Sequence, residues 1–222
     1  MYGIICLIEF LCLFLLSKQL TRSISLFLYK LKFNQLWTIR IIAIIFLPGT
    51  LIHELSHLLI AGLLGVQTGD LTVFPKLQGN TIRMGSVQVA KVDHLRQLFI
   101  GLAPVLSGLV ILFISFHFFF QQLNSLSYWI ICIFVYLLFV ITNSMFSSKK
   151  DVEGAGLLVI LSVLIFVALF IIDKQFLQQI QNLLMLIPSK YLSLSAYYLS
   201  LPLILDIGII FILRLLIRIK TL

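Results

Sequence analysis

Residues 53 to 57 carry the pattern with the clearest chemistry in the chain, His-Glu-Leu-Ser-His. On an α-helix, residues i and i+4 lie on one face, so the imidazoles of His53 and His57 can bind one metal ion. Glu54 lies about 100° around the helix from His53, which places its carboxylate beside that metal rather than on it. Such a carboxylate suits a general base acting on a metal-bound water. The pattern predicts a zinc site with Glu54 as the catalytic residue.

The surroundings of this pattern are strongly apolar. It lies within LPGTLIHELSHLLIAGLLG, residues 47–65, a stretch hydrophobic enough to sit in lipid. Ionisable groups inside a membrane are energetically expensive, so two imidazoles and a carboxylate in such a helix indicate a function. The structural alternative is that these polar residues merely pair with one another inside a helical bundle. Zinc binding is a sufficient reason for their presence.

The composition indicates that the whole chain belongs in a membrane. Of its 222 residues, 61% are hydrophobic and only 11% are charged, and the mean hydropathy is +1.14. No soluble core needs that much apolar surface. The sequence predicts an all-α, polytopic integral membrane protein that forms a single domain over residues 1–222. About six transmembrane helices are expected, at roughly 2–17, 39–65, 97–120, 128–147, 154–173 and 198–219.

The net charge of +8 does not indicate nucleic-acid binding, because the basic residues are scattered among loops and helix ends. That distribution is typical of anchoring to the surfaces of a lipid bilayer. Slightly more basic residues fall in the loops on the side of the N-terminus, which favours both termini in the cytoplasm of a protein of the cell membrane. The three cysteines lie inside predicted helices and are expected to be packing residues: Cys6, Cys12 and Cys132.

Two connecting stretches differ from the helices. Residues 18–40 mix lysine and arginine with leucine, phenylalanine and tryptophan, which predicts an amphipathic stretch at the membrane interface. Residues 69–92 contain β-prone runs separated by Pro75, Gly79, Asn80 and Gly85, which predicts a two- or three-stranded β-hairpin element. An open strand edge of this element can pair with an extended peptide.

A catalytic zinc site usually has three protein ligands and one open position for water, so one ligand must come from elsewhere in the chain. His117, Asp173 and Asp206 are expected near helix ends or membrane edges. Asp93 is as readily the N-cap of a helix that starts near residue 95. The other candidates flank the hairpin or fall between two predicted helices: Asp70, His94, Asp151 and Glu153. By spacing alone, His94, Asp151 and Glu153 are near equals.

These motifs resemble those of the site-2 protease family, the M50 class of intramembrane zinc metalloproteases. In that family a small residue, a glycine and a valine follow the His-Glu-x-x-His helix, and Ala61, Gly65 and Val66 match them here. A hairpin-like element comes next, and then a Gly-Pro-x-x-Asn-like signature. The corresponding stretch is LAPVLSG, residues 102–108, which keeps Pro104 but has Ala103 in place of the glycine and Ser107 in place of the asparagine. The resemblance covers a catalytic core of about residues 40–175, with 2–17 and 198–219 as additional helices.

The family's second metal motif is Asn-x-x-Pro-x-x-x-x-Asp-Gly. Asn143 and Asp151 have its eight-residue separation, whereas Phe146 replaces the proline and Val152 the glycine. The resemblance implies that Asp151 is the third zinc ligand and that Asn143 positions the substrate. The structural alternative for Asn143 is that it caps or breaks the end of its helix.

The resemblance implies a zinc metalloendopeptidase with one zinc ion per chain. Its reaction would be hydrolysis of a peptide bond in or near the transmembrane segment of a single-pass membrane protein. It also implies that the hairpin lies in the cytoplasm. A regulatory membrane partner, if there is one, is not identified by the sequence. The alternative function is that of a non-proteolytic membrane protein of the same family, either a metal-binding scaffold or a transporter component.

Overall fold

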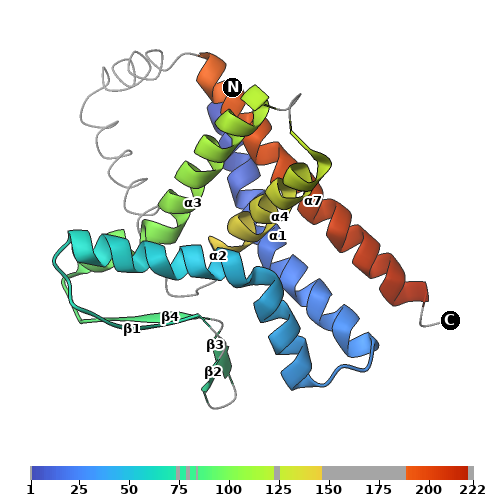
Figure 1. Ribbon diagram of the computed structural model, residues 1–222, viewed down its shortest axis with the longest axis horizontal. Coiled ribbons are helices and arrows are strands. Elements are labelled where there is room, and N and C mark those ends of the chain that lie inside the picture. Colours follow the sequence, from blue (N-terminus) through green and yellow to red (C-terminus); the bar gives the residue numbers. More distant parts are fainter. Residues whose placement is uncertain are drawn as a thin grey trace, which may run out of the picture.

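A computed structural model of the chain describes residues 2–73, 76–78, 81–83, 85–122, 126–146 and 189–219. The predicted span at 154–173 and the residues Asp151, Glu153 and Asp173 lie outside this described part. The helices are α1 (Tyr2–Lys30), α2 (Gln35–Leu63), α3 (His94–Gln122), α4 (Tyr128–Ser144) and α7 (Ser189–Ile219), and Figure 1 shows their arrangement. Four short strands separate α2 from α3: β1 (Thr68–Thr72), β2 (Lys76–Gln78), β3 (Thr81–Arg83) and β4 (Ser86–Val89).

The helices in the described part have the length and composition of membrane spans. Four of them are long and apolar enough to cross a bilayer, namely α1, α2, α3 and α7. The fourth predicted span corresponds to α4, a shorter apolar helix of 17 residues. The chain is therefore a mostly helical integral membrane protein, and the expected total of about six spans is not confirmed.

The stretch at 18–40, expected to be interfacial and helical in part, is helical to Lys30 as the continuation of α1. Its residues up to Lys30 belong to the candidate membrane span Ile8–Lys30, so the first span extends beyond the expected 2–17. Its polar side chains do not interrupt the helix, since their hydroxyl groups donate to carbonyl oxygens one turn earlier. Thr21 donates to Ser17 at 3.1 Å, and Ser23 donates to Gln19 at 2.9 Å. Hydroxyls satisfied in this way let a helix remain intact among apolar neighbours. A short turn at residues 31–34 then leads into α2, whose N-cap Asn34 accepts from the backbone N–H of Trp37 at 2.9 Å.

Helices α1 and α7 pack side by side and run in the same direction (Figure 1). Lys30, the last residue of α1, donates to the carbonyl oxygen of Ile217 near the end of α7. Because the C-terminal ends of the two helices meet, Tyr2 and Ile219 lie at opposite ends of the pair. This arrangement does not support the expectation that both termini lie in the cytoplasm.

Helix α2 bends near its middle, and the bend is visible in Figure 1. Pro48 lies inside the helix at this place, and a proline there removes one backbone hydrogen bond and clashes with the preceding turn. The neighbouring carbonyl oxygen of Ile45 accepts a hydrogen bond from the Tyr136 hydroxyl of α4 at 2.8 Å. The bend sets the C-terminal half of α2, which carries residues 53–57, at an angle to its N-terminal half.

The predicted β element is present and follows α2 directly. It has four short strands rather than two or three, arranged as two antiparallel pairs: β1 with β4, and β2 with β3. The two pairs form successive parts of one long hairpin, and an irregularity interrupts the β1–β4 register between Thr68 and Leu71. Both β1 and β4 contact α2. The hairpin therefore lies beside the helix half that carries the His-Glu-x-x-His pattern (Figure 1).

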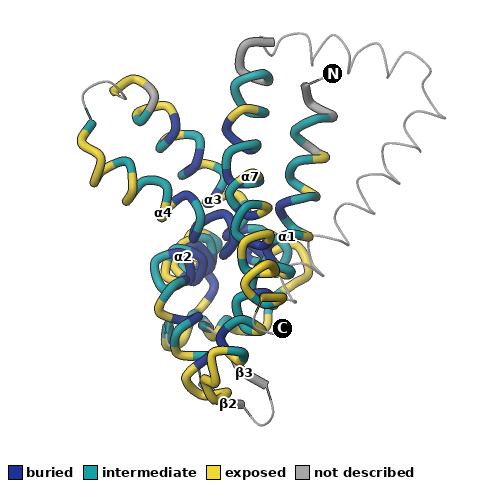
Figure 2. The backbone as a smooth tube through the Cα atoms, turned by 90° about the vertical axis from the view of Figure 1, so that its right-hand side faces the viewer, coloured by how far each residue is buried: buried dark blue, intermediate teal, exposed yellow. Residues whose placement is uncertain are grey.

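Buried positions concentrate where α2 crosses the other helices, whereas many outward-facing positions are exposed (Figure 2). The largest apolar cluster joins α1, α3, α4 and α7, with Phe116 and Leu138 at its centre. Many exposed side chains on the helices are large and apolar, such as Leu59, Ile114 and Phe211. An apolar outer surface around a partly polar interior is the arrangement that a bilayer favours.

Candidate metal centre

The C-terminal half of helix α2 turns its ionisable side chains inward and most of its leucines outward. His53, Glu54 and His57 are 2%, 6% and 9% exposed, whereas Leu55 is 44% and Leu59 63% exposed. This is the reverse of a soluble amphipathic helix, whose polar face meets water. The sequence places the three groups within five residues, and the structure brings all three to the buried side of the helix.

The two imidazoles meet at their Nε2 atoms. His53 Nε2 lies 3.3 Å from His57 Nε2, and the rings are nearly perpendicular at 85°. Two nitrogens that each lie about 2.0–2.1 Å from a tetrahedral zinc ion are about 3.3–3.4 Å apart. The spacing of this donor pair therefore fits zinc.

The orientation of the His57 ring is fixed by α3. Its Nδ1 lies 2.7 Å from the carbonyl oxygen of Ile100, and because a carbonyl can only accept, Nδ1 carries the hydrogen and donates it. The usual partner of that carbonyl would be the N–H of residue 104, one helical turn later, but Pro104 has none. The proline thus leaves the Ile100 oxygen open for His57. The neutral ring then keeps its Nε2 lone pair for a metal, an arrangement that tunes metal ligands in many proteins.

The hydrogen bond between His57 and Ile100 predicts that Pro104→Ala weakens metal binding, although residue 104 is not a candidate ligand. The new alanine N–H would compete with His57 for the Ile100 oxygen and loosen the ring. We expect the zinc affinity to fall by about 10-fold, the lower end for loss of an outer-shell partner. Zinc titration into the metal-free protein measures the effect. Equal zinc affinities for Pro104→Ala and the wild type would contradict the prediction.

Two further contacts enclose residues 53–57. The hydroxyl of Ser56 is hydrogen-bonded to that of Ser107 on α3, the position that matches the asparagine of the Gly-Pro-x-x-Asn-like signature. On the other side, Gly85 of the hairpin lies so close that a Cβ there would be 2.9 Å from Glu54 Oε1. A larger residue at position 85 would have to displace either Glu54 or the hairpin. The hairpin backbone therefore forms part of the wall around the carboxylate.

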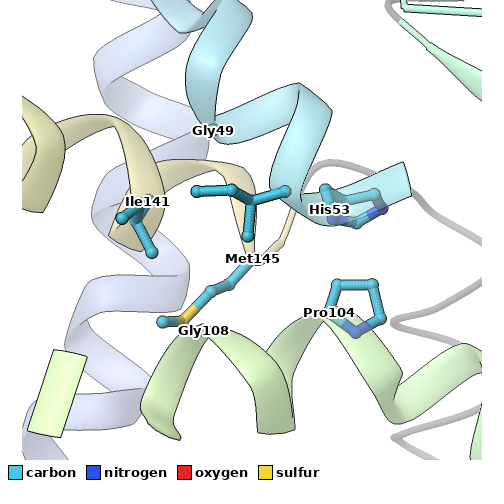
Figure 3. A pocket seen from close by; sticks show the side chains of 7 residues that line it. Gly49, His53, Pro104, Gly108, Ile141 and Met145 are labelled. Carbon is cyan, nitrogen blue, oxygen red and sulfur yellow. The ribbon is translucent and has the colours of Figure 1, made fainter. Parts of the chain in front are cut away.

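A narrow crevice opens beside His53 between α2, α3 and α4 (Figure 3). Its walls come from three helices: Gly49, Ile52 and His53 of α2, Pro104 and Gly108 of α3, and Ile141 with Met145 at the end of α4. It is too narrow to hold a water molecule. Met145 packs directly on Gly108, where an added Cβ would lie 2.7 Å from the Met145 Cγ atom. The end of α4 thus closes the crevice in this structure.

Asn143 lies on a different face of α4 from the crevice. It is two residues from Ile141 and from Met145, which is about 200° around a helix. Its Nδ2 donates both hydrogens, one to the Phe139 carbonyl oxygen at 2.9 Å and one to Asp206 Oδ1 on α7 at 2.8 Å. Neither N–H is available to a substrate in this arrangement, so the role of Asn143 in substrate positioning stays a prediction.

The other candidate ligands near the hairpin lie at the surface. Asp93 caps α3, accepting from the N–H of Arg96 at 3.2 Å, and pairs with the Arg96 side chain. Asp70, His94 and His117 are exposed, and His117 is hydrogen-bonded to Gln121. Among the described residues, no group of three His, Cys, Asp or Glu side chains is placed to hold one metal ion. Asp151 and Glu153 lie outside those residues, so the identity of the third ligand stays a prediction.

Sequence reasoning missed the structural roles of two buried residues, Asp206 and Pro104. Asp206 was expected near a membrane edge, but it lies in the middle of α7 and is 1% exposed. The signal was present, because a carboxylate inside an apolar span is expensive and needs a partner. Pro104 was recognised only as part of a signature. A proline four residues after a carbonyl always leaves that carbonyl open, but the sequence alone does not identify the group that uses it.

The model of one protein family, described as Peptidase M50B-like, matches residues 26–208 of the chain. The match includes the His-Glu-x-x-His helix, the hairpin, α3, α4 and most of α7, and it confirms the resemblance to the M50 class that the motifs indicate. Neither the curated proteins nor the solved structures gave a match.

Proposed function

Because the chain belongs to the Peptidase M50B-like family, we propose that it is an intramembrane zinc metalloprotease. Its reaction is hydrolysis of a peptide bond in or near the transmembrane segment of a single-pass membrane protein. The observation that carries this proposal is the inward-facing pair of imidazoles, 3.3 Å apart at Nε2, with Glu54 buried beside them. Family membership alone would also fit a protein that has lost its activity. The two imidazoles offer metal ligands and Glu54 offers a general base, which are the groups that zinc-dependent hydrolysis requires.

When bound, zinc supplies a Lewis acid that acidifies water and polarises the scissile carbonyl. The residues of the chain do the remaining work. His53 and His57 would hold the metal through Nε2, while the hydrogen bond to the Ile100 carbonyl keeps His57 in the tautomer that leaves this nitrogen open. A carboxylate oxygen of Glu54 takes the proton from the attacking water and then delivers it to the nitrogen of the leaving amine. The proton therefore moves from water to product through one side chain.

We propose Asp151 as the third ligand, since its separation from Asn143 matches the family's second metal motif. Carboxylate oxygen together with two imidazoles is a ligand set that suits catalytic zinc. Ile141 and Met145 line the crevice beside His53 at the end of α4, and Asp151 follows six residues after Met145 in the sequence.

The crevice beside His53 is closed, so it would have to open before a substrate could reach the proposed metal site. A peptide must be extended at the cleaved bond, and the space beside His53 does not admit even a water molecule. We therefore propose that cleavage requires Met145 to withdraw from Gly108. The hairpin backbone next to Glu54 offers strand edges to which an extended segment can add, a common mode of peptide recognition.

Removal and return of zinc test the proposal. The full chain is reconstituted in lipid vesicles with a panel of single-pass membrane segments, and the cleavage products are measured. We expect at least one segment to be cut within its apolar stretch, a chelator to stop the cleavage, and added zinc to restore it. Cleavage that persists without metal would contradict the zinc mechanism. Stoichiometric zinc binding without cleavage of any segment would instead favour the alternative, a non-proteolytic metal-binding protein.

A further inference from the structure

Asp206 is a buried carboxylate that the proposed reaction does not use. It lies in the span Ser193–Ile219 of α7 and is 1% exposed. Carboxylates at such positions are rare, and they are commonly retained for a functional reason. Its partner within the described part of the chain is the side chain of Asn143 on α4, which is 8% exposed. The pair therefore joins two helices through polar groups inside an otherwise apolar contact.

The geometry of the pair is determined by its neighbours. The Asn143 amide nitrogen faces two acceptors, the Phe139 carbonyl oxygen and Asp206 Oδ1. An amide oxygen in its place would face both acceptors without a hydrogen to offer, so the assignment of nitrogen and oxygen follows from the network. Both amide hydrogens are thus used, one inside α4 and one across to α7.

The end of α4 is surrounded by other helices, and most of its contacts with them are apolar. Residues 140–146 are all buried. Val140 and Ser144 approach Gly49 of α2 so closely that a side chain at Gly49 would not fit. On another side, Phe146 packs edge-on against Phe10 and Phe14 of α1, with ring centroids 5.2 and 5.4 Å apart. Apolar packing is not directional, so these contacts alone tolerate a helix that slides or rotates.

A single buried polar pair removes that freedom. Its hydrogen bond forms at one register of the two helices, and any other register leaves a buried carboxylate and amide without partners. The register of α4 also sets the positions of Ile141 and Met145, which line the crevice at His53. The same helix end leads, through the sequence, towards Asp151.

We propose that Asp206 is a positioning residue that, through Asn143, fixes the register of α4 against α7 and thereby the arrival of the third ligand at the metal centre. The inference rests on the proposed function, because it assumes a zinc site completed by a residue that follows α4. It assigns to Asn143 a partner on α7 rather than a contact with the substrate. It also assigns a role in metal binding to α7, which contributes no ligand.

The test separates register from stability. In Asn143→Leu/Asp206→Leu, both polar groups become apolar, an exchange that is often neutral or stabilising for buried charged groups. We expect its thermal unfolding temperature to equal or exceed that of the wild type, while its zinc affinity falls by about 10-fold or more. The conservative variant, Asp206→Asn, keeps an oxygen that can accept from Asn143 Nδ2, and it leaves the hydrogen bond from Asn143 to the Phe139 carbonyl intact. Its zinc affinity should stay within about 3-fold of wild type.

Zinc titration into the metal-free full chain in detergent micelles gives the affinities, and thermal unfolding of the same samples gives the stabilities. Ile210→Ala, a buried apolar site one turn further along α7, is the control that lowers stability without touching Asn143, and it should leave zinc affinity unchanged. The proposal is overturned if the double-leucine variant binds zinc like the wild type, or if affinity follows unfolding temperature in all variants. A wild type that binds no zinc would overturn the proposed function itself, and this inference with it.

Discussion

Glu54→Gln should leave a folded, zinc-loaded protein that no longer cleaves. Glutamine keeps the shape and the burial of Glu54, which is 6% exposed beside Gly85 of the hairpin, but it cannot accept a proton at neutral pH. Cleavage of a susceptible membrane segment should fall by a factor on the order of 10² to 10⁴, the usual contribution of a positioned general base. Zinc content and unfolding temperature should stay near those of the wild type, because Glu54 is not a ligand.

The matched control for this variant is Glu9→Gln, the same change at a carboxylate of α1 with an oxygen that is also buried. It should cleave like the wild type, which shows that loss of a carboxylate inside the membrane is not itself harmful. Glu54→Gln with wild-type cleavage would remove the general base from the mechanism. Glu54→Gln with lost zinc would mean that the carboxylate serves as a ligand.

The second large effect is expected from His57→Ala, which deletes a proposed ligand together with its support from Ile100. Zinc affinity should fall by more than the roughly 10- to 100-fold that loss of an outer-shell partner produces. Cleavage should fall with it, and excess zinc should restore only part of the activity, since two ligands hold the metal less rigidly than three. Metal analysis and cleavage measured on the same preparations distinguish this variant from Glu54→Gln, which loses cleavage alone.

His117→Ala provides the control for the removal of an imidazole. His117 is exposed on α3 and hydrogen-bonded to Gln121, so its loss should change neither zinc content nor cleavage. Wild-type zinc binding by His57→Ala would show that the metal is held elsewhere. The 3.3 Å contact between the two imidazoles would then be only a structural pairing.

The meeting of the two imidazoles on α2 could be predicted from the sequence because its spacing rule is local. Residues i and i+4 share a face in any α-helix, so the meeting of His53 and His57 needed no knowledge of the rest of the fold. The hairpin was predictable for a similar reason, since its β-prone runs and turn residues are consecutive. The number of its strands was not, because the order of β-prone residues does not show that the hairpin divides into two short pairs, β1 with β4 and β2 with β3.

The errors arose where partners are distant in the sequence. The lysines and arginines among the apolar residues of 18–40 suggest an interfacial segment, but α1 continues through this stretch to Lys30 and packs along α7. Asp206 was placed near a membrane edge because its partner, Asn143, lies 63 residues earlier in the sequence. The use of the Ile100 carbonyl by His57 likewise needs two helices in contact. The i, i+4 spacing rule applies within one helix and does not predict contacts between residues of different helices.

The most direct test of a hydrolytic reaction inside the membrane is isotope incorporation. The full chain in lipid vesicles is supplied with zinc and with the panel segment that it cuts best, in water enriched in ¹⁸O, and the products are analysed by mass spectrometry. Hydrolysis by water, with Glu54 as the base, predicts a new carboxyl terminus inside the apolar stretch that carries one ¹⁸O atom. The same preparation of Glu54→Gln should yield almost none of this product. A segment that stays intact with zinc-loaded protein, or a labelled product formed equally by Glu54→Gln, would contradict the account.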